Sequence, residues 1–411
     1  MTLISNMQKS VFDLNKKFLP KDKNSVKEVI ILGSTGSVGS QALEICISNP
    51  EKFRVKALIA HKSIDDLIKQ AVAVEPEYVV LSESEAAEKV KTALSSRKIK
   101  TKVLSGENAK KEVISEGCDI AITAIPGIQG LELTLEAIKY SKVLAFANKE
   151  TIIYAGELML ELAEENKTCI IPIDSEHNAI FQILDGLEIE KIKKIILTAS
   201  GGPLLNSELG EIKNASVQDV LKHPTWKMGR KISVDSATLF NKALEVMEAS
   251  YLFGMRLDDI EVIIHPESIV HGMVRLHDGS LIMHAGARNM KLPISYALGW
   301  PNTGVFMEGL NLCDIGSLNF SAVDHQKFQI FQLAIDAAKR GVVQRITMNY
   351  ANEVAVQMFL DGRIKFFEIY EFVKKAIDEV DGIAFELNTK EYCKSVQKIC
   401  GYVEKLIFNH L

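Results

Sequence analysis

Gly33-Ser34-Thr35-Gly36-Ser37-Val38-Gly39 follows the apolar stretch Val26–Leu32, which predicts a buried strand. Glycines permit a tight turn at this point and let backbone amides approach a pyrophosphate at the start of the next helix. The spacing is GxxGxxG rather than GxGxxG, so the pattern taken alone also fits a purely structural turn. Its place at the first turn of an alternating strand–helix series favours a dinucleotide site, in which Gly33, Ser34, Thr35, Gly36, Ser37 and Val38 contact the cofactor.

Residues 26–175 alternate apolar strand patterns with helical patterns. The predicted strands are Val26–Leu32, Phe53–Ala60, Tyr78–Leu81, Asp119–Ile125, Val143–Ala147 and Thr168–Ile173. The helices predicted between them are Val38–Ser48, Ser63–Val74, Ser84–Leu94, Leu131–Tyr140 and Thr151–Asn166. Because such alternation forms a parallel sheet covered on both faces, this part is predicted to be an α/β, doubly wound, Rossmann-like domain.

The end of the second predicted strand bears on the choice of cofactor. A site for NAD usually places an acidic residue there, which binds the ribose hydroxyls. This chain has His61-Lys62-Ser63 instead, and Lys62 is suited to pair with a 2′-phosphate. A solvated surface lysine is the alternative interpretation. We therefore expect NADPH, with His61, Lys62 and Ser63 among the cofactor contacts.

The rest of the chain predicts two further regions. Residues 176–300 form a central α+β catalytic domain, with strands at Ile195–Ala199, Glu261–Ile264, Ile269–Leu276 and Ser280–Ala285. Its polar segment 206–230 predicts a mobile flap with a short helix. A linker, 301–324, leads to a C-terminal four-helix bundle over 325–411, with helices at Lys327–Arg340, Met348–Leu360, Phe366–Val380 and Lys390–Phe408.

Composition excludes several classes of protein. The 411 residues predict about two or three domains. The net charge of −5 lacks the basic excess typical of nucleic-acid-binding proteins, and no apolar run approaches the roughly 20 residues that span a bilayer. The six scattered cysteines favour buried thiols in a reducing compartment, the cytoplasm, over disulfides or zinc. Residues 1–25 resemble neither a secretory signal nor an arginine-rich transit segment, so they predict a structured or loose N-terminal extension.

Three acidic residues suggest a metal site. Asp174 and Glu176 follow the predicted strand Thr168–Ile173, and Glu245 lies in a helical pattern further along the chain. Carboxylate oxygens suit magnesium or manganese, and the histidines show no HxxxH zinc spacing. On spacing alone, helix capping or a salt bridge explains each acid equally well.

A second group of polar residues fits a bound anion. Asn241, Lys242 and Glu245 share one face of a predicted helix, although a solvent-facing set is the alternative. Ser200 precedes Gly201-Gly202, whose amides can form a small anion nest. Ser236 opens the helix that carries Asn241, or simply caps it. With His223, these groups predict a site for a phosphate or phosphonate.

Together these motifs resemble the 1-deoxy-D-xylulose 5-phosphate reductoisomerase family. The resemblance runs from about residue 26 to the C-terminus and is densest between 147 and 300. Its motifs are GSTGSVG at 33–39, ANKET at 147–151, PIDSEHNAIFQ at 172–182, TASGGP at 198–203, HPTWKMGRKISVDSATLFNKALEVMEA at 223–249 and IHPESIVHGMV at 264–274.

The resemblance implies a homodimer that uses NADPH and Mg²⁺ or Mn²⁺. Its small phosphorylated sugar substrate would be isomerised and reduced to 2-C-methyl-D-erythritol 4-phosphate, an isoprenoid precursor. It implies Asp174, Glu176 and Glu245 as metal ligands, and a catalytic set that adds Lys149, His223, Lys242 and His271. The family's substrate-binding residues correspond to Ser175, Glu176, Ser200, His223, Trp226 on the flap, Ser236, Asn241, Lys242 and Glu245. Further cofactor contacts are implied for Asn148, Lys149, Glu150, Met228, Gly229 and Met290.

The departures from the family pattern concern cofactor contacts. His61 and Ser63 stand where glycine and asparagine are usual, and Gly286-Ala287-Arg288-Asn289-Met290 differs from the common GxPDM. Two other classes of protein fit the sequence less well. A semialdehyde dehydrogenase requires an activated cysteine, and none stands in such a motif. A silent nucleotide-binding protein is disfavoured because the three acids and Lys242 are all present.

Overall fold

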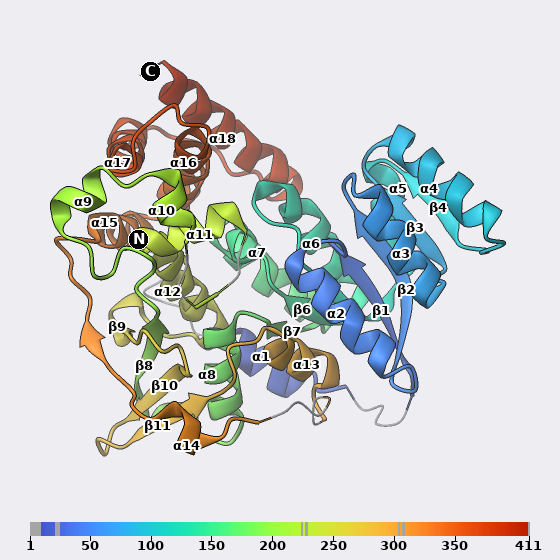
Figure 1. The fold of residues 1–411 in the computed structure, drawn as a ribbon, viewed down its shortest axis with the longest axis horizontal. Helices are drawn as coiled ribbons and strands as arrows, with labels where there is room; N and C mark the ends of the chain where they lie inside the picture. The colour runs from blue at the N-terminus through green and yellow to red at the C-terminus, as the bar shows by residue number, and fades with distance from the viewer. Residues whose placement is uncertain are drawn as a thin grey trace.

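The computed structural model describes residues 10–20, 25–222, 225–226, 229–302, 305 and 309–409. Two sheets lie in different parts of the molecule, and the C-terminal helices gather at one end (Figure 1). Two of the predicted site residues, His223 and Met228, lie outside the described residues. Within the described residues, no helix is long and apolar enough to cross a membrane.

The first sheet has seven strands in the order β4-β3-β2-β1-β5-β6-β7. All neighbouring strands are parallel, which confirms the predicted doubly wound sheet. The chain order reverses between β1 and β5, and ligands of such sheets bind in the crevice at that reversal. The strands are β1 (Lys27–Leu32), β2 (Phe53–Ala60), β3 (Tyr78–Leu81), β4 (Lys102–Ser105), β5 (Cys118–Thr123), β6 (Ser141–Phe146) and β7 (Cys169–Pro172).

A helix follows each of the first six strands. These helices are α2 (Ser37–Ser48), α3 (Ile64–Val74), α4 (Ser84–Ser96), α5 (Glu107–Ser115), α6 (Leu131–Tyr140) and α7 (Lys149–Asn166). The sequence prediction missed β4 and α5. Strand β4 forms one edge of the sheet, and its end residues Lys102 and Ser105 are exposed, so it has no continuous apolar run.

The second sheet has five strands in the order β11-β10-β8-β9-β12. Its strands are β8 (Ile192–Ala199), β9 (Ile260–Ile264), β10 (Val270–Leu276), β11 (Leu281–Ala285) and β12 (Ser321–Ala322). The pair β8–β9 is parallel and the other pairs are antiparallel. A tight turn at Asp278-Gly279 joins β10 to β11, with Gly279 at φ +91°. Helix α8 (Ser175–Asp185) packs on β10 and β11.

Short helices and the C-terminal helices complete the fold. Between β8 and β9 the chain forms α9 (Leu209–Lys213), α10 (Val217–Leu221), α11 (Arg230–Ala237) and α12 (Phe240–Phe253), and between β11 and β12 it forms α13 (Lys291–Gly299) and α14 (Leu312–Ile315). The four predicted C-terminal helices are α15 (Gln329–Lys339), α16 (Val342–Leu360), α17 (Glu368–Val380) and α18 (Tyr392–Phe408). Helix α16 packs on α17, α18 and α7, while α15 packs mainly on α12.

Residues 10–20 of the N-terminal extension are structured. They contain α1 (Val11–Lys17), whose N-cap Ser10 accepts a hydrogen bond from the Asp13 amide at 3.1 Å. Helix α1 lies against β7, α12 and α7 (Figure 1). This part of the extension is therefore an integral part of the core.

Helices α7 and α12 pack closely in the centre of the molecule. A Cβ atom added at Gly156 of α7 would lie 2.6 Å from the ring of Tyr251 on α12. The Tyr251 hydroxyl donates to Glu157 at 2.7 Å, and the buried guanidinium of Arg345 on α16 pairs with the same carboxylate at 2.8 Å. Glycine at position 156 thus sets how closely the two helices approach.

Replacing Gly156 with alanine should destabilise the fold. The added methyl group overlaps the Tyr251 ring, and overpacking of this kind costs about 1–3 kcal/mol. The measurement is the urea unfolding transition followed by circular dichroism. Gly210→Ala is the matched control, because no atom lies within 4 Å of a Cβ at that position on α9. Equal transitions for the two variants would contradict the packing argument.

Candidate active site

Three carboxylates from distant parts of the sequence converge. Asp174 follows β7, Glu176 lies in the first turn of α8, and Glu245 lies on α12. One oxygen from each lies within 4.8 Å of the others. The Glu245 side chain is 1% exposed, and those of Asp174 and Glu176 are 16% and 17% exposed. Three oxygen donors at this separation suit one hard divalent cation, so the donor set fits Mg²⁺ or Mn²⁺.

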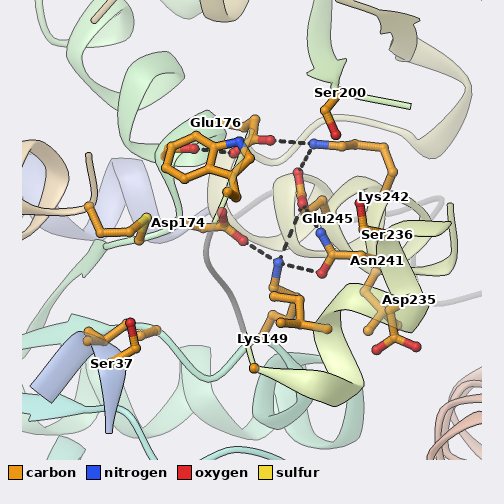
Figure 2. Close-up of a pocket in the computed structure, with 18 of the residues that line it drawn as sticks. Ser37, Lys149, Asp174, Glu176, Ser200, Asp235, Ser236, Asn241, Lys242 and Glu245 are labelled. Carbon is orange, nitrogen blue, oxygen red and sulfur yellow. Dashed lines mark hydrogen bonds and ion pairs between the residues drawn. The ribbon is translucent and has the colours of Figure 1, made fainter. Parts of the chain in front are cut away.

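Two lysines alternate with these acids (Figure 2). Lys149 pairs with Asp174 and lies 3.4 Å from Glu245. Lys242 lies 2.5 Å from both Glu176 and Glu245. Three carboxylates against two ammonium groups leave an excess of negative charge, which a further cation would balance.

Asn241 completes the cluster. Its amide nitrogen donates to Glu245 at 2.6 Å, and its amide oxygen accepts from Lys149 at 3.0 Å. Ser175 donates to the other carboxylate oxygen of Glu176 at 2.5 Å. These bonds fix the carboxylate orientations from the protein side.

Neighbouring charges separate the pKa values of Glu245 and Asp174. Burial, followed by the nearby Glu176 carboxylate, raises the pKa of Glu245 to about 7, although Lys242 opposes the shift. Burial also raises the pKa of Asp174, but Lys149 and His177 outweigh that effect and leave it below its ordinary value. Burial, the largest cause, thus outweighs the two lysines at Glu245 but not the opposing charges at Asp174.

A glycine turn places two serines beside the acids. Gly201 and Gly202 follow Ser200 and have φ of +82° and +70°. A Cβ at Gly202 would lie 2.7 Å from the carbonyl oxygen of Ser236, so glycine lets this turn pack directly on α11. Ser200 and Ser236 line the same cavity as Lys242 (Figure 2).

The nucleotide loop depends on two of its glycines. Gly33 has φ +86°, and a Cβ there would lie 2.7 Å from the carbonyl oxygen of Ala124. A Cβ at Gly39 would lie 2.2 Å from the Gly33 carbonyl oxygen. Helix α2 begins after Gly36 with no side-chain cap on its first amides, and its first residues Ser37 and Val38 line the cavity. This is the arrangement in which helix termini bind phosphate groups.

One cavity of about 800 Å³ joins these features. At one end it is lined by Gly36, Ser37 and Val38, and at the other by the acids and serines. Ser37 lies well apart from the acid cluster across this space (Figure 2). Other predicted residues that line the cavity are Asn148, Lys149, Glu150, Ser175, Trp226, Gly229, Asn241, His271 and Met290.

Other predicted cofactor residues lie outside this lining. The Ser34 side chain is fully buried, and its carbonyl oxygen accepts from Gln70 at 2.8 Å. Thr35 is half-buried. His61 and Lys62 are exposed and Ser63 is half-buried, just beyond β2. The β2 end is joined to the loop because the amides of Gly33 and Ser34 donate to Ile59.

His271 and Trp226 lie together at the cavity wall. His271 is buried on β10, and its ring centroid is 6.3 Å from that of Trp226. Burial lowers the pKa of His271 more than Glu176 raises it, which favours the neutral imidazole near neutral pH.

Sequence reasoning missed several residues that surround the site. The His177 ring contacts the Glu245 carbonyl oxygen through Nε2 at 2.8 Å and faces Glu248 through Nδ1 at 3.4 Å. Asp174, His177 and Glu248 form a second convergent group within 4.8 Å. The available signal was the i,i+3 spacing of His177 after Asp174 and of Glu248 after Glu245.

Lys231 is a further residue near the site that sequence reasoning missed. It lies at the start of α11 and pairs with Glu150 at 3.1 Å and with Asp235 at 3.0 Å. Asn352 on α16 donates to Asp235 at 2.7 Å. These contacts tie the end of the flap region to α7 and to the C-terminal helices.

Comparisons with known proteins match nearly the whole chain. Residues 29–156 match the 1-deoxy-D-xylulose 5-phosphate reductoisomerase model, 170–253 its C-terminal domain model, and 285–404 a DXP reductoisomerase C-terminal domain model. A 1-deoxy-D-xylulose 5-phosphate reductoisomerase from Clostridium tetani is 42% identical, covering 94% of this chain and 99% of the relative. The chloroplastic enzyme from Oryza sativa is 40% identical, covering 91% and 83%.

Solved structures agree with the sequence comparisons. A reductoisomerase from Zymomonas mobilis in complex with NADPH superposes with a TM-score of 0.85 at 34% identity, over 93% of this chain and 99% of the other. A DOX-P reductoisomerase in complex with NADPH, fosmidomycin and magnesium gives 0.87 at 35% identity, over 93% and 98%. The fold class expected from the motifs is thus confirmed, and the chain belongs to the 1-deoxy-D-xylulose 5-phosphate reductoisomerase family.

Proposed function

We propose that three parts of this chain carry out the reaction of its family. They are the acid cluster of Asp174, Glu176 and Glu245, the serine pocket formed by Ser200 and Ser236, and the nucleotide loop at 33–39. The chain is an NADPH- and metal-dependent oxidoreductase that isomerises and reduces 1-deoxy-D-xylulose 5-phosphate to 2-C-methyl-D-erythritol 4-phosphate, a step of isoprenoid precursor biosynthesis. One observation carries the residue assignments. A single cavity is lined by a phosphate-binding loop at one end and by three convergent carboxylates at the other.

Asp174, Glu176 and Glu245 would hold Mg²⁺ or Mn²⁺. The bound ion supplies Lewis-acid polarisation of oxygen atoms on the substrate. Lys149 and Lys242 keep the acids oriented and limit the excess negative charge. Both ammonium groups also lie at the cavity wall, where they are able to stabilise negative charge that develops on the substrate.

The serine pocket would bind the substrate phosphate. Ser200, Ser236 and Asn241 supply hydrogen-bond donors, and Lys242 supplies positive charge. Because the phosphate is remote from the reacting carbons, its binding energy is available to orient the substrate between the acids and the nicotinamide. We assign His223 to the same pocket from the family motif.

The nucleotide loop would bind the NADPH pyrophosphate, and the coenzyme supplies the hydride. Lys62 would pair with the 2′-phosphate, and Asn148 and Met290 would lie near the nicotinamide. The described lining of the cavity contains no cysteine. Burial raises the pKa of Cys169 to about 12, which is the reverse of thiol activation. The cysteine chemistry of a semialdehyde dehydrogenase therefore has no support here.

Trp226 would form part of a flap, made by residues 206–230, that excludes water from the reacting carbonyl group.

The domain divisions are proposed as 26–175 for NADPH binding, 176–300 for catalysis and 325–411 for the helical bundle, with a linker at 301–324. A homodimer is proposed from the family, and β11 offers an edge strand with Leu281 and Met283 40% and 46% exposed. A cytoplasmic location is supported by six cysteines that are all free.

Glu245→Gln should lower turnover by about 100-fold or more while NADPH still binds. The change keeps the side-chain shape but removes the charge shared by the proposed metal and Lys242. Removing even a residue that only hydrogen-bonds to a metal ligand lowers metal affinity or activity by about 10–100-fold. Turnover is measured as NADPH absorbance decay with and without Mg²⁺, and Glu161→Gln, exposed on α7, is the control. Near-normal turnover would remove Glu245 from the metal shell.

Trp226→Ala should reduce kcat/KM by about tenfold or more, which corresponds to about 1.4 kcal/mol of transition-state stabilisation. The half-buried ring contributes little to the core, so the melting temperature should change by less than about 2 °C. Steady-state kinetics and thermal unfolding check the two parts separately. Leu209→Ala on the exposed side of the flap region is the control. An unchanged kcat/KM would contradict the flap role.

Lys62→Glu should shift the preference from NADPH toward NADH. The substitution replaces attraction for a 2′-phosphate with repulsion, so the NADPH-to-NADH ratio of kcat/KM should fall by about tenfold or more. Lys69→Glu, exposed on α3, makes the same charge change away from β2. Equal ratios in both variants would remove Lys62 from the cofactor site.

A further inference from the structure

Helix α1 lies outside every segment matched by the family models, which begin at residue 29. It nevertheless contacts each element that carries the acid cluster. It packs on β7, which leads to Asp174, on α12, which carries Glu245, and on α7, which begins at Lys149. These contacts are made with core elements of the protein and not with a surface loop.

Asn15 of α1 binds the free edge of β7. Its amide nitrogen donates to the Ile170 carbonyl oxygen at 2.6 Å, and its amide oxygen accepts from the Ile170 N–H at 2.8 Å. Asn15 is 2% exposed, so both bonds are shielded from water. One side chain thus makes the two bonds that a further strand would make. Ile170 lies only four residues before Asp174.

The same helix contacts the middle of α8. The ring of Phe12 packs edge-on against Phe181 with centroids 5.2 Å apart, and both rings are buried. Phe181 lies on α8, in the helix whose first turn carries Glu176. Restraining α8 through Phe181 also restrains the direction in which Glu176 enters the cluster.

A third contact fixes the end of α12. Gly254 ends that helix with φ +67°, and a Cβ there would lie 3.2 Å from the Cβ of Ser10, the N-cap of α1. Helix α12 is the element that carries Asn241, Lys242 and Glu245. The N-terminus of α1 therefore abuts the element that supplies the third acid.

We infer that α1 is a positioning element for the metal site. It fixes β7, α8 and α12 from the side away from the cavity and so sets the spacing of Asp174, Glu176 and Glu245. Asn15 is its principal residue, because its two bonds lie closest in sequence to an acid. This inference rests on the proposed function, since it presumes that the three acids bind the divalent ion.

The test is Mn²⁺ binding to the full chain, measured by electron paramagnetic resonance without substrate. Asn15→Leu removes both bonds to Ile170 and keeps an apolar side chain of similar size. We expect its Mn²⁺ dissociation constant to rise by about tenfold, the lower end of the range for residues that support metal ligands. NADPH affinity should stay within about twofold, because the nucleotide loop follows β1. Lys17→Ala, on the exposed side of α1, is the control and should leave both constants unchanged.

An Asn15→Leu protein that binds NADPH normally and keeps wild-type Mn²⁺ affinity would overturn the inference. If Asn15→Leu does not bind NADPH, Phe12→Leu takes its place in the test. A Phe12→Leu protein with normal NADPH binding and an unchanged Mn²⁺ dissociation constant would then overturn the inference. Wild-type and Glu245→Gln proteins keep the two proposals apart. Loss of Mn²⁺ binding in Glu245→Gln supports the metal site itself, whatever the α1 variants show.

Discussion

The site depends on a balance of charge among five buried or nearly buried side chains. Lys149 joins Asp174 to Glu245, and Lys242 joins Glu176 to Glu245, so each ammonium group is shared by two carboxylates. Removing charges from water is costly unless geometry is good and other hydrogen bonds are satisfied. Alternation of sign meets that condition, yet leaves the cluster with more negative than positive charge. A divalent cation at the three acids, as proposed above, would balance that excess.

That cluster requires the ends of two neighbouring strands of the first sheet to meet three helices. β6 ends just before α7, which begins with Lys149, and β7 ends just before Asp174 and α8. Helix α12 packs on α7. Gly156 permits α7 and α12 to pack with the Tyr251 ring between them. The ion pair between Glu157 and Arg345 then links the same helix to α16. The C-terminal helices consequently support the site without lining it.

The sequence was a good guide wherever structure followed from a local pattern. β2 and β3 have the predicted boundaries, because their apolar residues are buried on both faces. β4 was missed since an exposed edge strand carries no such pattern. The motif residues were identified, but their pairing was not. Lys149 and Glu245 are 96 positions apart, and only the fold brings them together. In the sequence, His177 and Glu248 look like ordinary helix residues. Only the fold brings the His177 ring to the Glu248 carboxylate, at 3.4 Å.

The two edges of the seven-stranded sheet suggest a structural reason for the N-terminal helix α1. An unpaired edge with apolar side chains invites pairing with another chain unless it is covered or made polar. β4 meets this need with its exposed Lys102 and Ser105. β7 consists of Cys169-Ile170-Ile171-Pro172, all buried, so it has no polar residue to protect its edge. The strand that leads to Asp174 at the cavity wall stays apolar, and a cover supplied from outside the sheet, such as α1, protects its edge without adding a polar residue to it.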